Sequence, residues 1–203
     1  MRLSQVCICL LGIAAFGVGC DDDSPPIIGD PTHYASPSAP ESLISNLQVS
    51  YRRREIEQYA NLLAPEFLFR FQPIDQSTIG KESWTHDEDS VGTRALLTTP
   101  EVAVIRIDLL YAGRDSSMDK TPPADSVRIR IHTTDLEIDQ TNDISWVATD
   151  EQDFFFRKGL PANGEDHARW FMYEWDDIPT LTSPRPLPTP ASTWGNIKNR
   201  YSH

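Results

Sequence analysis

Cysteine is scarce in this sequence, and none occurs beyond its first 20 residues. The three cysteines of the 203-residue chain are Cys7, Cys9 and Cys20. Residues 21–203 therefore cannot form a disulfide or a cysteine-ligated zinc site.

Basic residues are also few. The chain has 18 Lys and Arg against 30 Asp and Glu, which gives a formal net charge of −12. Nucleic-acid-binding proteins neutralise phosphates with clustered Lys and Arg, so this balance argues against a nucleic acid as partner. We find no internal repeat. The chain has no phosphate-binding loop, dinucleotide fingerprint or zinc-protease motif, and we predict no cofactor.

The first 20 residues have the composition of an export signal. Arg2 precedes an uncharged apolar run over residues 3–19, and Cys20 follows. A basic start, a short apolar core and small residues before the cleavage point are the parts of a secretory signal peptide. The segment Gly17-Val18-Gly19-Cys20 resembles the lipobox of bacterial lipoproteins, although Gly17 departs from the usual Leu. The resemblance implies that residues 1–19 are removed and that Cys20 carries acyl chains such as palmitate.

This reading divides the chain into four parts. Residues 1–19 are the signal peptide, residues 20–37 a lipidated cysteine with a flexible tether, residues 38–178 the folded domain, and residues 179–203 a proline-rich extension with a terminal helix. We expect lipid to hold the protein to the inner or outer membrane of the bacterial envelope. The alternative is an uncleaved anchor helix, because 17 uncharged residues are the lower limit of a span. In either case the remaining chain lies outside the cytoplasm.

Two consecutive helices are predicted at the start of the folded domain. The first opens at Ser38, which is followed three residues later by Glu41 in a capping-box pattern. The second extends to Leu63 and ends before Pro65. The apolar residues at helical spacing are Leu43, Ile44, Leu47 and Tyr51 in the first helix, and Ile56, Tyr59, Ala60 and Leu63 in the second. In the terminal helix of the chain, Trp194 and Ile197 are expected to dock back onto the domain.

Strand-like patterns follow. Residues 67–72 alternate between Phe and other side chains, which is the period of a β-strand. Thr85 and Glu88 form a second capping-box pattern, which predicts a helix through Leu97. That pattern also accounts for the acidic run after His86, so we predict no metal site there. Four more strands are expected at residues 102–112, 126–138, 145–158 and 168–176.

The order helix, helix, strand, helix and four strands resembles nuclear transport factor 2-like domains. The residues that carry the resemblance are the stretch 51–67, Trp84 before an acidic helix, and Trp170 to Trp175 in a late strand. It implies an α+β fold in which a curved antiparallel sheet wraps around three helices as a cone with a pocket at its open end, here followed by a short C-terminal helix. Many members form homodimers through the outer face of the sheet.

The family includes ketosteroid isomerases and polyketide cyclases, which use an Asp base and an oxyanion-holding Tyr. Aligned on this sequence, the base position falls on Gln72 and the Tyr position on Leu47. Gln cannot accept a proton at neutral pH and Leu cannot donate a hydrogen bond. We therefore favour a non-catalytic module that binds a small ligand or a partner. The alternatives are a pocket enzyme that uses another carboxylate, Glu174 or Asp176, and a purely structural dimerising domain.

The candidate ligand-binding residues depend on which face of the first strand points inward. In one register Leu68, Arg70 and Gln72 face the pocket, together with Tyr51 and Trp84. An inward Arg70 would then need an acidic side chain or an anionic ligand. A shift of one residue reverses the faces, so that the three Phe residues form the core and Arg70 meets solvent.

Overall fold

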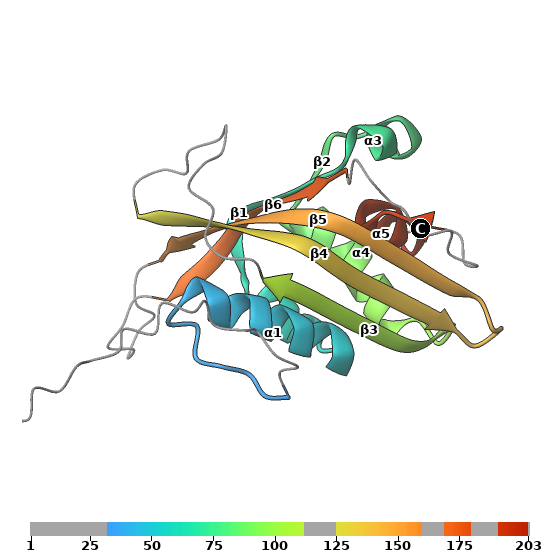
Figure 1. The fold of residues 1–203 in the computed structure, drawn as a ribbon, viewed down its shortest axis with the longest axis horizontal. Coiled ribbons are helices and arrows are strands. Elements are labelled where there is room, and N and C mark those ends of the chain that lie inside the picture. Colours follow the sequence, from blue (N-terminus) through green and yellow to red (C-terminus); the bar gives the residue numbers. More distant parts are fainter. Residues whose placement is uncertain (1–31, 112–124, 160–168, 180–190, 203) are drawn as a thin grey trace, which may run out of the picture.

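A computed structural model describes residues 32–111, 125–159, 169–179 and 191–202 (Figure 1). The predicted signal peptide, Cys20, most of the predicted tether and the proline-rich stretch 180–190 lie outside these residues. Across the described ranges, no helix is long and apolar enough to cross a membrane.

One curved sheet contains all the strands of the described residues. It consists of β1 (Leu63–Arg70), β2 (Ser83–Thr85), β3 (Val102–Tyr111), β4 (Ser126–Gln140), β5 (Ser145–Lys158), β6 (Trp170–Ile178) and β7 (Ala191–Ser192). The strand order is β2-β1-β6-β5-β4-β3. Most neighbours are antiparallel, but β1 runs parallel to β6 and β7 runs parallel to β5. The two-residue β7 pairs with Val147 and Ala148, on the stretch of β5 that precedes its pairing with β6.

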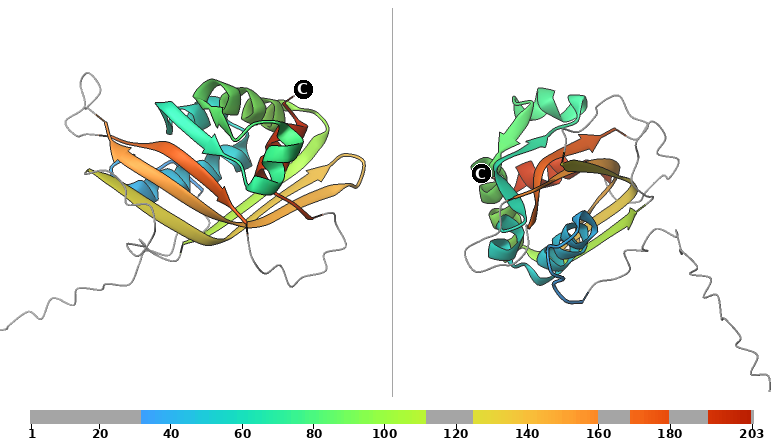
Figure 2. Two further views of the ribbon diagram at one scale, coloured as in Figure 1. Left: turned by 90° about the horizontal axis from the view of Figure 1, so that it is seen from above. Right: turned by 90° about the vertical axis from the view of Figure 1, so that its left-hand side faces the viewer.

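The sheet does not close, and helices occupy its concave side (Figure 2). They are α1 (Pro40–Arg53), α2 (Ile56–Ala60), α3 (Pro73–Ile79), α4 (His86–Thr98) and α5 (Trp194–Arg200). Helix α1 packs against β3 and α4 against β1, while α5 contacts β5, α3 and α4. The predicted α+β architecture, a curved and mainly antiparallel sheet around helices with a short C-terminal helix, is confirmed.

Side-chain alternation along the strands explains why the sheet has one apolar face. On β4, Ile129 and Ile131 are fully buried, whereas Arg128 and Arg130 point to the other face, where both form ion pairs with Asp153. Successive residues of a strand point to opposite faces, so this period places one stripe of apolar side chains in the core.

The first strand has the second of the two registers considered above. Phe67, Phe69 and Phe71 are buried in the core, whereas Leu68 is half-buried on the outer face and Arg70 is exposed. The register in which Leu68 and Arg70 face the pocket is therefore wrong. Burying three aromatic rings is more favourable than burying an arginine, which would require a compensating charge.

Several element boundaries also differ from expectation. The second helix ends at Ala60, and Leu63 already belongs to β1, which includes Pro65. The first helix has Ala39 as its N-cap with no side-chain cap, so the predicted capping box at Ser38 is wrong. The capping box of Thr85 and Glu88 is confirmed. The short elements α3, β2 and β7 were not predicted.

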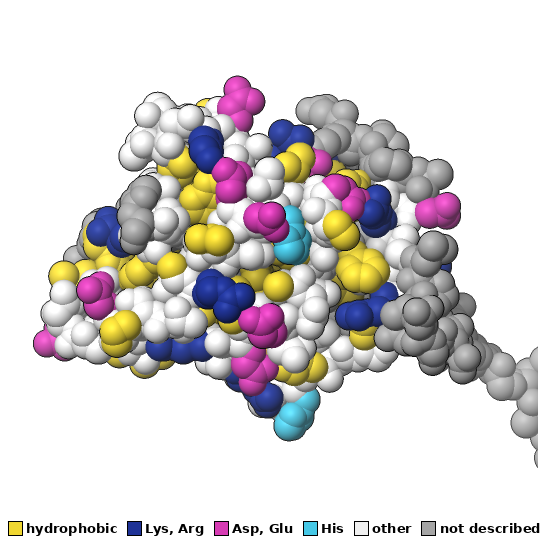
Figure 3. Space-filling view, turned by 180° about the vertical axis from the view of Figure 1, so that it is seen from behind, with side chains coloured by type: hydrophobic (Ala, Val, Ile, Leu, Met, Phe, Trp, Pro, Cys, Tyr) yellow, Lys and Arg dark blue, Asp and Glu magenta, His cyan; other side chains and the backbone are white. Residues whose placement is uncertain are grey.

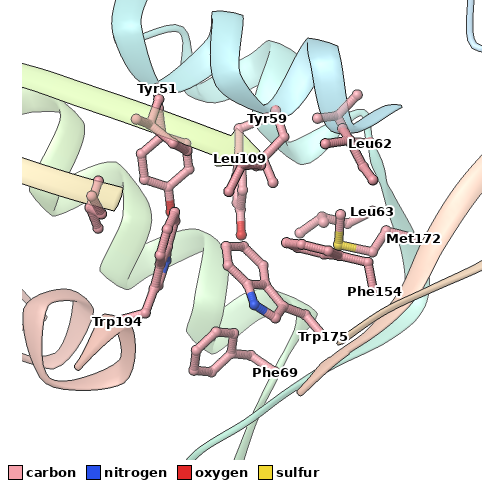
Figure 4. Packing of buried hydrophobic residues seen from close by; sticks show 14 of the residues in the cluster. Tyr51, Tyr59, Leu62, Leu63, Phe69, Leu109, Phe154, Met172, Trp175 and Trp194 are labelled. Carbon is pink, nitrogen blue, oxygen red and sulfur yellow. The ribbon is translucent and has the colours of Figure 1, made fainter. Parts of the chain in front are cut away.

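An aromatic cluster fills the centre of the cone (Figure 4). Trp175 of β6 packs against Phe69, Phe154 and Trp194, with ring centroids 4.9 to 5.2 Å apart. Tyr51 of α1 contacts Trp194 edge-on at 5.7 Å. Trp194 and Ile197 are buried, which confirms that the terminal helix docks back onto the domain.

Candidate functional site

Helix α5 packs against β5, α3 and α4, and its Trp194 and Lys198 side chains are fully buried. It enters beside Asp75 of α3, and its side chains reach the aromatic cluster. Gly195 allows this close approach, because a Cβ there would lie 2.6 Å from the Phe71 ring. The interior that the family resemblance assigns to a ligand is therefore filled by the chain itself.

The five predicted ligand-binding residues do not form one site. Tyr51 and Gln72 are buried in the interior, Leu68 and Arg70 are on the outer face, and Trp84 lies at the edge of the core. The structure thus brings Tyr51 and Gln72 to the same interior, with Trp84 buried at its edge, and leaves Leu68 and Arg70 on the outer face.

Arg70 has acidic partners on the outer face. Its Nε lies 3.0 Å from Glu174 Oε1 and 3.6 Å from Asp176 Oδ1. The two spare carboxylates that we considered for catalysis are therefore ion-pair partners of Arg70 outside the cone. An anion-binding role for an unpaired Arg70 is not supported by this arrangement.

Asp177, the residue after Asp176, carries a carboxyl group that is buried inside the protein. Its Oδ1 accepts hydrogen bonds from Gln72 Nε2 at 3.1 Å and from Gln152 Nε2 at 2.8 Å. Its Oδ2 accepts one from the backbone N–H of Gly195 at 3.1 Å. Burial, reinforced by the charge of Asp150, raises the pKa of Asp177 to about 7. Gln72, which occupies the expected base position, thus binds a carboxyl that could accept a proton.

Three aspartates surround the beginning of α5. Asp75 accepts hydrogen bonds from the Thr193 hydroxyl at 2.5 Å and from Asn196 Nδ2 at 2.6 Å. Burial raises the pKa of Asp75, and it raises that of Asp150 to about 6, although hydrogen bonds from Gln72 and the backbone of Trp194 oppose the shift. The carboxyl groups of Asp75 and Asp177 accept hydrogen bonds from Thr193, Gly195 and Asn196, and these bonds hold the start of α5 in place.

A buried ion pair holds the other end of α5. Lys198 Nζ lies 2.5 Å from Asp89 Oδ1 of α4, and both side chains are 0% exposed. The Tyr59 hydroxyl donates a hydrogen bond to Asp89 Oδ2 and accepts one from Lys198 Nζ at 3.1 Å. Three elements, α2, α4 and α5, therefore meet at one polar cluster inside the aromatic core.

A surface cleft remains open beside α5. Figure 3 shows one face of the molecule, on which charged and apolar side chains are interspersed. Its volume is about 390 Å³. Lys81 and Glu88 form an ion pair at its edge, and Trp84 forms part of its wall. Helix α4 approaches Trp84 closely at Gly92, where a Cβ would lie 2.8 Å from the ring. The lining residues are Ile79, Lys81, Trp84, Asp87, Glu88, Val91, Asn199 and Ser202.

Metal-ligating groups are not clustered in the part of the chain that the structure describes. No set of three or more His, Cys, Asp or Glu side chains there could hold a metal ion. The acidic run after His86 instead begins α4, and Glu88 completes its capping box.

Comparisons with known proteins find distantly similar solved structures but no matching family. No protein-family model and no curated protein matches the chain. Among solved structures, a nuclear transport factor 2-like superfamily protein from Salmonella enterica has a TM-score of 0.49 at 9% identity, over 71% of this chain and 92% of that one. A candidate scytalone dehydratase from Novosphingobium aromaticivorans also gives 0.49, at 8% identity over 74% and 88%. A candidate aromatic ring hydroxylase from the same species gives 0.49, at 11% identity over 78% and 92%.

Sequence reasoning missed the interior polar residues Asp89, Asp150, Asp177 and Lys198. Asp177 and Asp150 stand in strands that alternate inward and outward residues, so the strand period could have found them once one buried neighbour was fixed. Lys198 follows Ile197 in a short polar helix, and no local pattern signals that it is buried.

Proposed function

We propose that this chain is an exported, lipid-anchored binding module that takes a small amphipathic ligand in the cleft beside α5. The observation that carries the proposal is the combination of a cone filled by α5 and an open cleft at its side. The cleft volume of about 390 Å³ is within the range of about 300–1,000 Å³ that is usual for small-molecule sites.

The chemistry of the cleft favours a ligand with an apolar body and a polar end. Ile79, Trp84 and Val91 supply apolar surface, and Val91 is 60% exposed. Asn199 and Ser202 supply neutral hydrogen-bonding groups from the end of α5 and the residues after it. Charged groups of both signs are present, so net charge does not select the ligand.

A ligand screen with two matched variants tests the cleft. Small amphipathic compounds are screened by thermal shift and titrated by calorimetry against the full chain. Val91→Glu should abolish binding of a true cleft ligand, because it places a charge on the apolar wall. Ile74→Glu is the control, since Ile74 is 70% exposed on α3 and does not line the cleft. Equal affinity in both variants would place the ligand elsewhere and contradict the proposal.

The lipid anchor is tested separately. Cells that express the full chain are fed an alkyne fatty acid, and the label on the protein is detected after click coupling. Cys20→Ser should abolish the label, and Cys9→Ser should retain it, because Cys9 lies in the segment to be removed. Label in the Cys20→Ser variant would refute lipidation at this cysteine. Membrane attachment and location in the envelope rest on this result.

The buried aspartate pair favours a second candidate function, acid–base catalysis. Asp177 has a pKa near 7 beside Gln72, which is the expected position of the base, and α5 covers it. The reaction would require α5 to withdraw. Turnover of an enolisable ketone that is lost in Asp177→Asn and kept in Asp176→Asn would support this alternative. Homodimerisation through the outer sheet face remains a prediction, which sedimentation of the full chain tests.

A further inference from the structure

The ion pair between Lys198 and Asp89 is not used by the proposed function. Both residues are completely buried, and they join α5 to α4. Removing two charges from water costs several kcal/mol for each ion, so a buried pair of this kind calls for an explanation beyond stability.

Aromatic rings enclose the lysine amine. Nζ lies 4.4 Å from the ring centroids of Phe69 and Trp175, and 5.4 Å from that of Tyr59. Burial lowers the pKa of Lys198, while the charges of Asp89 and Asp177 oppose this effect. A lysine in such surroundings can lose its proton and act as a nucleophile.

The amine of Lys198 lies next to the carboxyl group of Asp89. Lys198 Nζ contacts Asp89 Oδ1, and the carbon that would react is one bond from that oxygen. The Tyr59 hydroxyl donates to the other oxygen, Oδ2. Nucleophile, electrophile and hydrogen-bond donor are held by three separate elements, and such fixed proximity can replace most of the entropy cost of a bimolecular reaction.

We propose that Lys198 and Asp89 form an intramolecular amide bond that covalently joins α5 to α4. The observations that carry the proposal are the 2.5 Å contact, the complete burial of both groups and the hydrogen bond from Tyr59. Residues 21–203 contain no cysteine, so a disulfide cannot serve this purpose in that part of the chain.

The reaction balances without a co-reactant. The ammonium group of Lys198 first transfers one proton to Asp89 Oδ1. The neutral amine then attacks Cγ, and negative charge develops on Oδ2, where the Tyr59 hydroxyl stabilises it. As the C–Oδ1 bond breaks, Oδ1 takes a second proton from nitrogen and leaves as water. The product is a neutral secondary amide, which removes both charges from the core.

Mass spectrometry of the wild-type protein is the primary test. The folded full chain is incubated, denatured and digested with trypsin, which cleaves after Lys and Arg except before Pro, as at Arg185-Pro186. A cross-linked protein yields a branched peptide in which residues 82–94 are joined to residues 170–200, lighter than their sum by one water molecule. Cleavage after Lys198 is also lost, because the modified side chain is no longer a trypsin substrate.

Three variants separate the cross-link from simple packing. Lys198→Arg keeps a cation but lacks the amine, and should yield separate peptides. Asp89→Asn should yield the same branched peptide with loss of ammonia in place of water. Tyr59→Phe should form it more slowly than wild type after refolding, since the donor to Oδ2 is removed.

The proposal would be overturned if wild-type protein yields the unmodified peptides 82–94 and 170–198. Native near-ultraviolet circular dichroism must first show that this protein is folded. That readout needs no variant to fold, so a destabilised substitution cannot obscure it. The result is also independent of whether the cleft binds a ligand.

Discussion

The aspartates around the start of α5 predict an unusual dependence of stability on pH. Asp177 is buried and its pKa is raised to about 7, and that of Asp150 is raised to about 6. In the unfolded chain an aspartate loses its proton near pH 4. Between these values the folded protein binds more protons than the unfolded chain. The free energy of unfolding therefore falls as pH rises from about 4 to about 7.

The size of the effect follows from the same groups. Each pKa unit of difference between the folded and unfolded states is worth about 1.4 kcal/mol. A rise to about 7 for Asp177 corresponds to about 4 kcal/mol across the full window. When Asp177 loses its proton, its negative charge stands beside that of Asp150, so the start of α5 should loosen first. We expect faster amide hydrogen exchange in α5 at pH 7.5 than at pH 5, after correction for intrinsic exchange rates.

Urea denaturation between pH 4 and pH 8 measures the effect. Wild-type protein should lose about 2–4 kcal/mol over this range. Asp177→Asn cannot ionise and should make the decline smaller, leaving the part that Asp150 contributes, whatever the absolute stability of the variant. Asp176→Asn on the outer face is the matched control and should keep it. A flat profile in wild type, or equal slopes in the two variants, would refute the reasoning.

Three other substitutions, together with Ser38→Ala as a control, have predictable effects on the free energy of unfolding in urea. Lys198→Met leaves the buried carboxyl group of Asp89 without its Lys198 partner and should lower stability by about 3–5 kcal/mol; a loss under about 1 kcal/mol contradicts the importance of this contact. Gly92→Ala must displace the Trp84 ring and should cost about 1–3 kcal/mol and weaken any cleft ligand; unchanged affinity and stability would show that the ring yields freely. Thr85→Ala removes a cap and should cost about 0.5–2 kcal/mol, whereas Ser38→Ala should be neutral because Ser38 is not a cap.

Much of the fold was predictable because its long elements have clear periods. The Phe alternation at residues 67–71 identified a strand, and the Thr85 and Glu88 pattern located the start of α4. Trp194 and Ile197 were rightly expected to dock. These signals depend on neighbours in sequence, and they can therefore be read without the tertiary structure.

The orientation of β1 could not be predicted, because a period of two defines two faces but not which one is inside. The pairing of β1 with β6 joins residues about 100 positions apart, and no local pattern encodes it. The burial of Lys198 depends on Asp89 and Tyr59, which come from two other helices. The site was therefore less predictable than the fold, since its contacts are almost all long-range.

The place of α5 in the sequence has a consequence for biosynthesis. Ribosomes make the chain from its amino end, so β1 to β6 are all synthesised before Trp194 and Lys198 of α5, which are buried between them. Until then Trp175, Tyr59 and Asp89 lack the contacts that they make with Trp194 and Lys198 in the complete fold. A chain that ends before residue 198 would lack Lys198, which joins α5 to α4. We expect proteases to degrade such a truncated chain faster than the complete protein.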